Sequence, residues 1–194
     1  MRRRFFVLLA AGLIGLVAGC GSSNSSRDSG SHPSANTSAH NSVDVEFAQM
    51  MIPHHEQAIE MAALVATRAG SGAVKSLATD IDGAQGPEIT TMTGWLKAWG
   101  QPTSHMGGMH MGHGSMPGLM SNEDMSILKT LTGKAFDKQF LTMMVSHHRG
   151  AILMAQKEKK DGKNSEAVAL AKRIATSQAA QITEMRKLLA SNAG

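Results

Sequence analysis

The sequence predicts an all-α protein, a four-helix bundle in which one helical hairpin occurs twice. From residue 43 onward, apolar residues recur every three or four positions, and strand-like alternation never extends beyond a few residues. A shift of 93 residues also lays the first half of this region on the second half without a gap. Two amphipathic hairpins bury their apolar stripes best against each other, which favours a bundle.

An internal duplication explains the match between the two halves. The motif Asp-x-x-Phe-x-x-Met-Met-x-x-His-His-x-x-Ala-Ile-x-Met-Ala occurs at residues 44–62 and again at residues 137–155. At the same offset, Leu77, Ala78, Ile81, Gln85, Ile89, Met92 and Leu96 match Leu170, Ala171, Ile174, Gln178, Ile182, Met185 and Leu189.

Residues 1–19 have the features of a lipoprotein signal peptide. Three arginines at positions 2–4 precede an apolar run at 5–18, which is short for a membrane span. Val17-Ala18-Gly19-Cys20 then resembles a bacterial lipobox, in which the cysteine is lipidated and becomes the mature N-terminus. The alternatives are an ordinary cleaved signal or a short anchor helix. We expect a lipid on Cys20, which would anchor the protein in the bacterial cell envelope, at the outer face of the cytoplasmic membrane or in the periplasm.

Residues 20–42 are rich in Ser, Asn and Gly, so after the lipidated cysteine they form a flexible tether.

The composition of the chain excludes several classes of function. Cys20 is the only cysteine, which excludes an internal disulfide and a thiolate metal cage. Aromatic residues make up 4% of the chain, and the arginines at 2–4 supply most of its +4 net charge, so no nucleic-acid partner is expected.

Glycine, proline and capping residues set the expected helix boundaries. Pro53 is expected either to kink the first helix or to follow a separate short helix. Gly83-x-x-Gly86-Pro87 is expected to kink or interrupt the second, and a capping box at Ser121–Asp124 starts a short one. The expected helices span 43–69, 73–99, about 122–132, 134–160 and 165–191, so repeat one covers 43–99 and repeat two 134–192.

The connection at residues 100–121 decides between two bundle topologies. It is long enough to run along a helix of ~26 residues and ~39 Å. A ferritin-like bundle with one long crossover is therefore feasible, and an up-down-up-down bundle is the alternative.

Each copy of the repeat places a histidine within an apolar helical face. At 100° per residue, His54 lies beside Met61 and Met50 near the centre of that face, whereas His55 lies at its edge. Met50 and Met51 precede the two histidines by four residues, or about one turn. Thioether and imidazole together suit Cu(I) or Ag(I), and carboxylates are absent from this face. The alternative is that the methionines fill the core and the histidines are structural.

His54 and the equivalent His147 are expected to lie inside the bundle, close to each other. Two charged imidazoles would repel, so the neutral forms should dominate near pH 7. With an unperturbed pKa of ~6.5, metal binding is expected to weaken around or below pH 6.

The crossover itself forms a third cluster of soft donors. Glycines separate its methionines and histidines, so a regular helix or packed core does not explain them, although a low-complexity loop remains the alternative. The candidate metal ligands here are His105, Met106, Met109, His110, Met111, His113 and Met116.

The doubled motif resembles the secreted bacterial proteins grouped as domain of unknown function 305, over residues 43–192. That resemblance implies a ferritin-like four-helix bundle and, for some members, copper binding and copper tolerance. Carried over to this chain, it points to Met50, Met51, His54, His55, Met61, Met143, Met144, His147, His148 and Met154 as metal ligands.

These observations predict a membrane-anchored lipoprotein that binds soft metal ions, most readily Cu(I), for sequestration or copper tolerance. It would be a binding protein rather than an enzyme, and it would exchange copper with a partner protein. A structural or partner-binding lipoprotein without metal is the alternative. A metal-dependent oxidase is a lesser one, because the Glu-x-x-His motif of di-iron bundles is absent from both motif helices.

Overall fold

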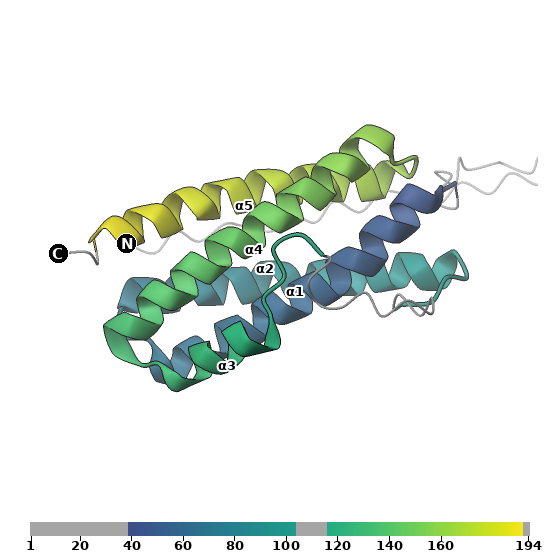
Figure 1. Ribbon diagram of the computed structural model, residues 1–194. Coiled ribbons are helices and arrows are strands. Elements are labelled where there is room, and N and C mark those ends of the chain that lie inside the picture. The colour runs from purple at the N-terminus through teal and green to yellow at the C-terminus, as the bar shows by residue number, and fades with distance from the viewer. Residues whose placement is uncertain (1–38, 104–115, 192–194) are drawn as a thin grey trace, which may run out of the picture. The chain divides into compact units, whose positions relative to one another are not determined.

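The computed structural model describes residues 39–103 and 116–191, and these residues form a helical bundle without β-strands (Figure 1). The all-α prediction is therefore confirmed. The helices are α1 (Ser42–Arg68), α2 (Gly72–Ala98), α3 (Asn122–Thr130), α4 (Gly133–Asp161) and α5 (Ser165–Ser191).

Several predicted features lie outside the described residues. These are the signal peptide, Cys20, the tether up to residue 38, and the crossover donors His105, Met106, Met109, His110, Met111 and His113. None of the described helices has both the length and the hydrophobicity needed to cross a membrane.

Capping boxes start two of the helices, and the one at α3 is the one that the sequence predicts. The Asn41 side chain accepts hydrogen bonds from the first turn of α1, and the Asp44 carboxylate accepts one from the Asn41 backbone nitrogen at 2.6 Å. Ser121 and Asp124 make the same reciprocal pair at the start of α3. Such pairs satisfy backbone donors that the first helical turn leaves free.

Neither proline divides its helix. α1 runs through Pro53 and α2 runs through Gly83, Gly86 and Pro87 without a break. The expected interruption of α2 was therefore wrong, as was a separate short helix before Pro53. In the last turns of α2, Leu96 is fully buried, so tertiary packing holds the segment helical beyond the proline.

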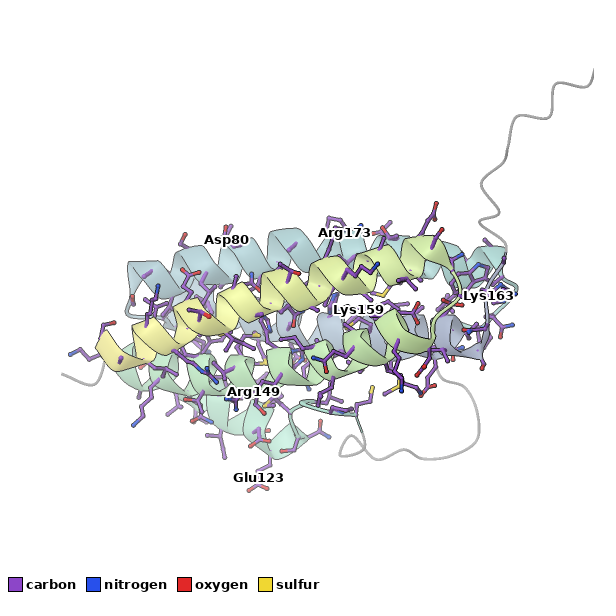
Figure 2. All side chains as sticks on the ribbon, turned by 90° about the horizontal axis from the view of Figure 1, so that it is seen from above. Asp80, Glu123, Arg149, Lys159, Lys163 and Arg173 are labelled. Carbon is purple, nitrogen blue, oxygen red and sulfur yellow. The ribbon has the colours of Figure 1, made fainter. Side chains whose placement is uncertain are left out.

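The four long helices pack as two pairs. α1 packs against α2 and α4 against α5, and the pairs meet through contacts of α1 with α4 and of α2 with α5. The short helix α3 lies against α4. Charged side chains such as Asp80, Arg149 and Arg173 lie on the exposed surface (Figure 2).

Two buried aspartates form hydrogen bonds between the two helix pairs, each with the turn that joins the helices of the other pair. Asp44 on α1 accepts hydrogen bonds from the backbone nitrogens of Lys163 and Asn164, at 3.0 and 2.8 Å, between α4 and α5. Asp137 on α4 accepts hydrogen bonds at 3.1 and 2.9 Å from the backbone nitrogens of residues 70 and 71, between α1 and α2. These contacts are related by the 93-residue offset, so equivalent residues of the two copies make equivalent hydrogen bonds.

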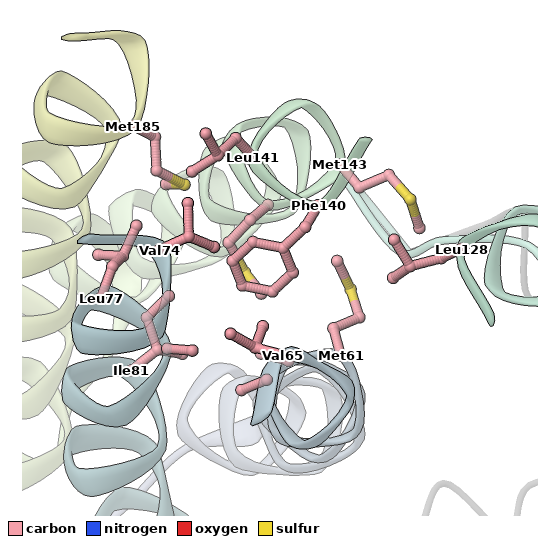
Figure 3. Close-up of a cluster of buried hydrophobic side chains, with 14 of the residues drawn as sticks. Met61, Val65, Val74, Leu77, Ile81, Leu128, Phe140, Leu141, Met143 and Met185 are labelled. Carbon is pink, nitrogen blue, oxygen red and sulfur yellow. The ribbon is translucent and has the colours of Figure 1, made fainter. Parts of the chain in front are cut away.

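Two apolar clusters fill the interior. The first, shown in part in Figure 3, gathers Met61, Ile81, Phe140 and Met144 with Leu128 of α3. The second gathers Met51, Met92, Leu170 and Ile174, among others. In each long helix, roughly two to three turns separate the buried residues of one cluster from those of the other, and these turns carry buried polar side chains.

Candidate metal centre

A layer of polar side chains crosses the bundle between the two apolar clusters. We call it the polar layer, and each long helix contributes two residues to it. Eight of the ten buried side-chain nitrogen and oxygen atoms without a hydrogen-bond partner, among the described residues, belong to this layer. Its members are His54, His55, Gln85, Glu88, His147, His148, Gln178 and Gln181.

The rings of His54 and His147 meet at the contact of α1 with α4. Their centroids are 3.7 Å apart, the planes are tilted by 38°, and both side chains are fully buried. His54 donates through Nε2 to the carbonyl oxygen of Pro117 at 3.1 Å, which leaves its Nδ1 as an unpartnered acceptor. Neither ring nitrogen of His147 has a hydrogen-bond partner. The expectation that these two histidines meet inside the bundle is confirmed.

His55 and His148 are buried as deeply as their neighbours, although the helical wheel puts them at the edge of the apolar face. His55 donates through Nε2 to Glu88 at 2.7 Å, and His148 donates through Nε2 to the side-chain oxygen of Gln181 at 2.8 Å. In both rings, Nδ1 is buried and has no hydrogen-bond partner among the described residues. The partners on α2 and α5 cover a position that would be exposed on an isolated helix.

Burial favours the neutral form of His54, His147 and His148. Desolvation lowers the pKa of His54 to about 3, helped by nearby His55, and lowers the pKa of His148 to about 4. Desolvation and the adjacent His54 also hold the pKa of His147 well below its ordinary value. These pKa values lie well below the unperturbed value of about 6.5, so protonation in the folded state falls in the lower part of the range expected from the sequence, around or below pH 6.

The chemistry of the polar layer fits a soft metal ion. Neutral imidazoles with free lone pairs are the form of histidine that ligates metal, and a hydrogen-bond acceptor on the other ring nitrogen fixes the orientation of the ring. Within residues 39–103 and 116–191, no three His, Cys, Asp or Glu side chains are grouped so as to hold a metal ion. An ion here would therefore also need a thioether or an amide oxygen.

The methionines lie in three settings. Met51 and Met144 are fully buried, one in each apolar cluster, on either side of the polar layer. Met61 and Met143 share the first cluster, near Leu128 (Figure 3). The remaining pair, Met50 and Met154, lines a pocket of about 160 Å³ between α1 and α4, together with Pro117 and Glu158.

The end of the crossover lies directly on the polar layer. Besides the Pro117 carbonyl on His54, the backbone of Met120 exchanges two hydrogen bonds with the Gln57 side chain, at 2.8 and 2.9 Å. A Cβ on Gly150 would lie 1.8 Å from the Pro117 oxygen, so only glycine lets this segment approach α4. Residues 116–120, with Met116 half-buried at their start, lead from the Met/His-rich crossover to the histidine pair.

Sequence reasoning missed half of the polar layer. Gln85 and Gln178 are buried and matched between the copies, but they were noted only as repeat identities. A glutamine in an otherwise apolar helical stripe, present in both copies, was the available signal. Glu88 escaped notice because it reaches His55 from another helix, so the absence of carboxylates from one helical face did not exclude a carboxylate partner.

Comparison with known proteins identifies the family. Residues 44–189 match the model of DUF305, a domain of unknown function. The chain belongs to the DUF305 family. This confirms the resemblance inferred from the doubled motif, and the match spans both motif copies.

Solved DUF305 structures have the same arrangement of helices. A DUF305 protein from Streptomyces coelicolor, described as secreted, is 33% identical with a TM-score of 0.73, over 78% of this chain and 94% of that one. CopM in its Cu(II)-bound form is 35% identical with a TM-score of 0.67, over 76% of this chain and 96% of that one. CopM also has Cu(I)-bound and Ag-bound forms. No curated protein is significantly similar to the chain.

Proposed function

We propose that this DUF305 protein is an extracytoplasmic, lipid-anchored protein that binds Cu(I) and sequesters it outside the cytoplasm. The observation that carries the proposal is the polar layer, in which each of four buried histidines has at least one ring nitrogen without a hydrogen-bond partner, between methionine-containing clusters. A buried polar atom without a hydrogen-bond partner costs about 1–3 kcal/mol, so a partner for the eight such atoms of this layer would stabilise the folded protein. A bound ion, with ordered water, would satisfy them.

The residues divide into those that would hold the ion and those that would orient the ligands. His54, His147 and the Nδ1 atoms of His55 and His148 are the imidazole donors, and the neighbouring methionines supply thioethers. Soft thioethers favour Cu(I) over Zn²⁺ or Mg²⁺. The related CopM, which has Cu(I)-bound, Cu(II)-bound and Ag-bound forms, supports copper as the cargo.

The 93-residue offset fits a ferritin-like four-helix bundle derived from a duplicated hairpin. The reciprocal contacts of Asp44 and Asp137, and the meeting of His54 with His147, support this reading, because equivalent residues occupy equivalent places. In such a bundle the ion would bind near the pseudo-twofold axis.

Anchoring and location follow from the N-terminal sequence. The lipobox around Cys20 supports a lipid anchor in the cell envelope, and the Streptomyces coelicolor relative is described as secreted. The Met/His-rich crossover would capture the ion before it reaches the bundle, and a copper-exchange partner would receive it. We propose binding rather than catalysis, because the motif helices have no Glu-x-x-His.

Anaerobic Cu(I) titration against a competing chelator tests the proposal. Three proteins are compared: the mature chain, a variant with every crossover Met changed to Leu and every crossover His to Asn, and that variant with His54→Gln and His147→Gln added. The second protein should retain bundle binding, and the third should lose most of it. If all three bind equally, or if the second binds nothing while remaining folded, the polar layer is structural only.

A further inference from the structure

His55 and His148 occupy equivalent positions of the repeat but have chemically different partners. His55 is bonded to the carboxylate of Glu88 at 2.7 Å, whereas His148 is bonded to the amide of Gln181 at 2.8 Å. Glu88 and Gln181 are themselves related by the 93-residue offset, so they hold the same place on α2 and α5. The polar layer thus has two halves of matching geometry, and only one of them includes an acidic group.

A carboxylate and an amide act differently on a ligating imidazole. An ionised carboxylate only accepts hydrogen bonds, so Glu88 holds the proton of His55 on Nε2 and strengthens Nδ1 as a donor. Its negative charge also offsets the charge of a cation bound on the other side of the ring. Gln181 holds the same tautomer in His148 but supplies no charge.

The different burial of His55 and Glu88 supports a role of Glu88 that acts through the ring of His55. The His55 side chain is fully buried, whereas the Glu88 side chain is 18% exposed at the edge of the layer. Glu88 therefore keeps contact with solvent while it touches a buried ring. The negative charge of Glu88 therefore acts on a buried ring while the carboxylate stays partly exposed. Full burial of the carboxylate would cost much more free energy.

We propose that the polar layer contains two unequal ion sites, and that Glu88 makes the His55 half bind Cu(I) or Ag(I) more tightly than the His148 half. The inference rests on the proposed function, because it presupposes that the layer binds the ion. Glu88 is a positioning residue, since it acts through His55. Two affinities would let one bundle hold a first ion firmly and release a second one more readily.

Two isosteric substitutions and their combination test the assignment. Glu88→Gln gives both halves an amide, Gln181→Glu gives both a carboxylate, and the double variant exchanges the two halves. Ag(I) is the probe, added to the full mature chain labelled with ¹⁵N-histidine. The ring nitrogens of His55 and His148 are followed by NMR, which separates bundle sites from the crossover.

In the wild type, the first Ag(I) to enter the bundle should shift Nδ1 of His55 before that of His148. Glu88→Gln should weaken binding at His55 by about 10- to 100-fold and remove the order of filling. Gln181→Glu should tighten binding at His148, and the double variant should fill His148 first. The metal-free spectra should show both histidines protonated on Nε2.

Three results overturn the inference. Equal filling of His55 and His148 in the wild type contradicts it, as does an unchanged order in the double variant, and in both cases bundle binding itself survives. If neither ring responds to Ag(I) in the folded wild type, the proposed function fails as well, so the two failures are distinguishable.

Discussion

The imidazole of His54 lies 3.7 Å from that of His147, and both rings are shut off from solvent. Neither histidine has an acidic partner, since the Pro117 carbonyl is the one hydrogen-bond partner that His54 has and His147 has none among the described residues. A proton added to either ring would be a buried charge beside another imidazole. The contact is stable only while both rings are neutral.

Acid should therefore destabilise the metal-free protein. The pKa of His54 is about 3 and that of His148 about 4 in the folded state, against about 6.5 in the unfolded chain. Because the unfolded state binds more protons, stability is full above pH 6.5 and falls as the pH drops toward these lower values. At pH 4, His54 alone should cost about 3 kcal/mol of unfolding free energy, at about 1.4 kcal/mol for each tenfold change in proton affinity.

Urea unfolding followed by circular dichroism between pH 4 and 8 measures this effect. His54→Gln combined with His147→Gln should make the profile shallower, with the contribution of His148 remaining, while a substitution of the exposed Glu123 to Gln should leave its shape unchanged. A wild-type profile that stays flat down to pH 4 would show that these rings take up protons inside the fold.

Cys20 should carry a lipid in the mature protein. The apolar run ending in Val17-Ala18-Gly19-Cys20 predicts that processing leaves this cysteine as the N-terminus. Mass spectrometry of protein extracted from membranes should find acyl chains on Cys20, and Cys20→Ala should release most of the protein into the soluble fraction. An unmodified cysteine, or a variant that stays fully membrane-bound, contradicts the lipid anchor.

The sequence predicted the helices closely because their signals are local. Helical periodicity, the capping box that begins at Ser121 and the glycines that end each segment fixed boundaries within one or two residues for most helices. The paired histidines His54 and His147 could also be predicted, because the repeat marks the same position twice on an apolar face.

Contacts between helices were not accessible in this way. His55 appears at the edge of its own helix and becomes buried only because α2 brings Glu88 to it. The contact of the Pro117 backbone with Gly150 depends on the path of the crossover, and a loop has no hydrophobic periodicity from which its path could be predicted. The burial of Glu158 could not be predicted either, because a charged side chain is normally exposed and its environment is formed by other helices.

Replacing Glu158 with valine, the residue at the equivalent position of the first repeat, should stabilise the protein at alkaline pH. Glu158 occupies the position of Val65 in the repeat, and burial together with the nearby Asp44 raises its pKa to about 8. Because this pKa is raised above the unfolded value of 4.5, the stability linked to Glu158 is full below pH 4.5 and is lost as the pH rises toward and through 8.

Glu158→Val should therefore raise the melting temperature by roughly 5 °C at pH 8.5 and by much less at pH 5. Differential scanning calorimetry at both values measures the difference. Glu60→Gln is the control, because Glu60 is exposed and its ion pair with Lys129 lies at the surface, so its removal should have little effect at either pH. A gain that is equal at both pH values would assign the effect to packing instead.

Gly150→Ala should displace residues 116–120 from the polar layer. The new Cβ would lie 1.8 Å from the Pro117 oxygen and 2.4 Å from its carbonyl carbon, both backbone atoms that cannot move alone. The same oxygen accepts the hydrogen bond from His54, so the substitution breaks a contact at the histidine pair. Overpacking of this kind typically costs about 1–3 kcal/mol, although alanine favours a helix over glycine by up to about 1 kcal/mol.

Gly94→Ala in α2 separates these two effects, because a Cβ at Gly94 has no neighbour within 4 Å. We expect this control to gain stability in urea unfolding and Gly150→Ala to lose it. The His54 Nε2 proton, followed by NMR, should exchange with solvent faster in Gly150→Ala and remain protected in Gly94→Ala. If Gly150→Ala is as stable as the control and His54 stays protected, then residues 116–120 do not cover the polar layer, and access of an ion to His54 is governed elsewhere.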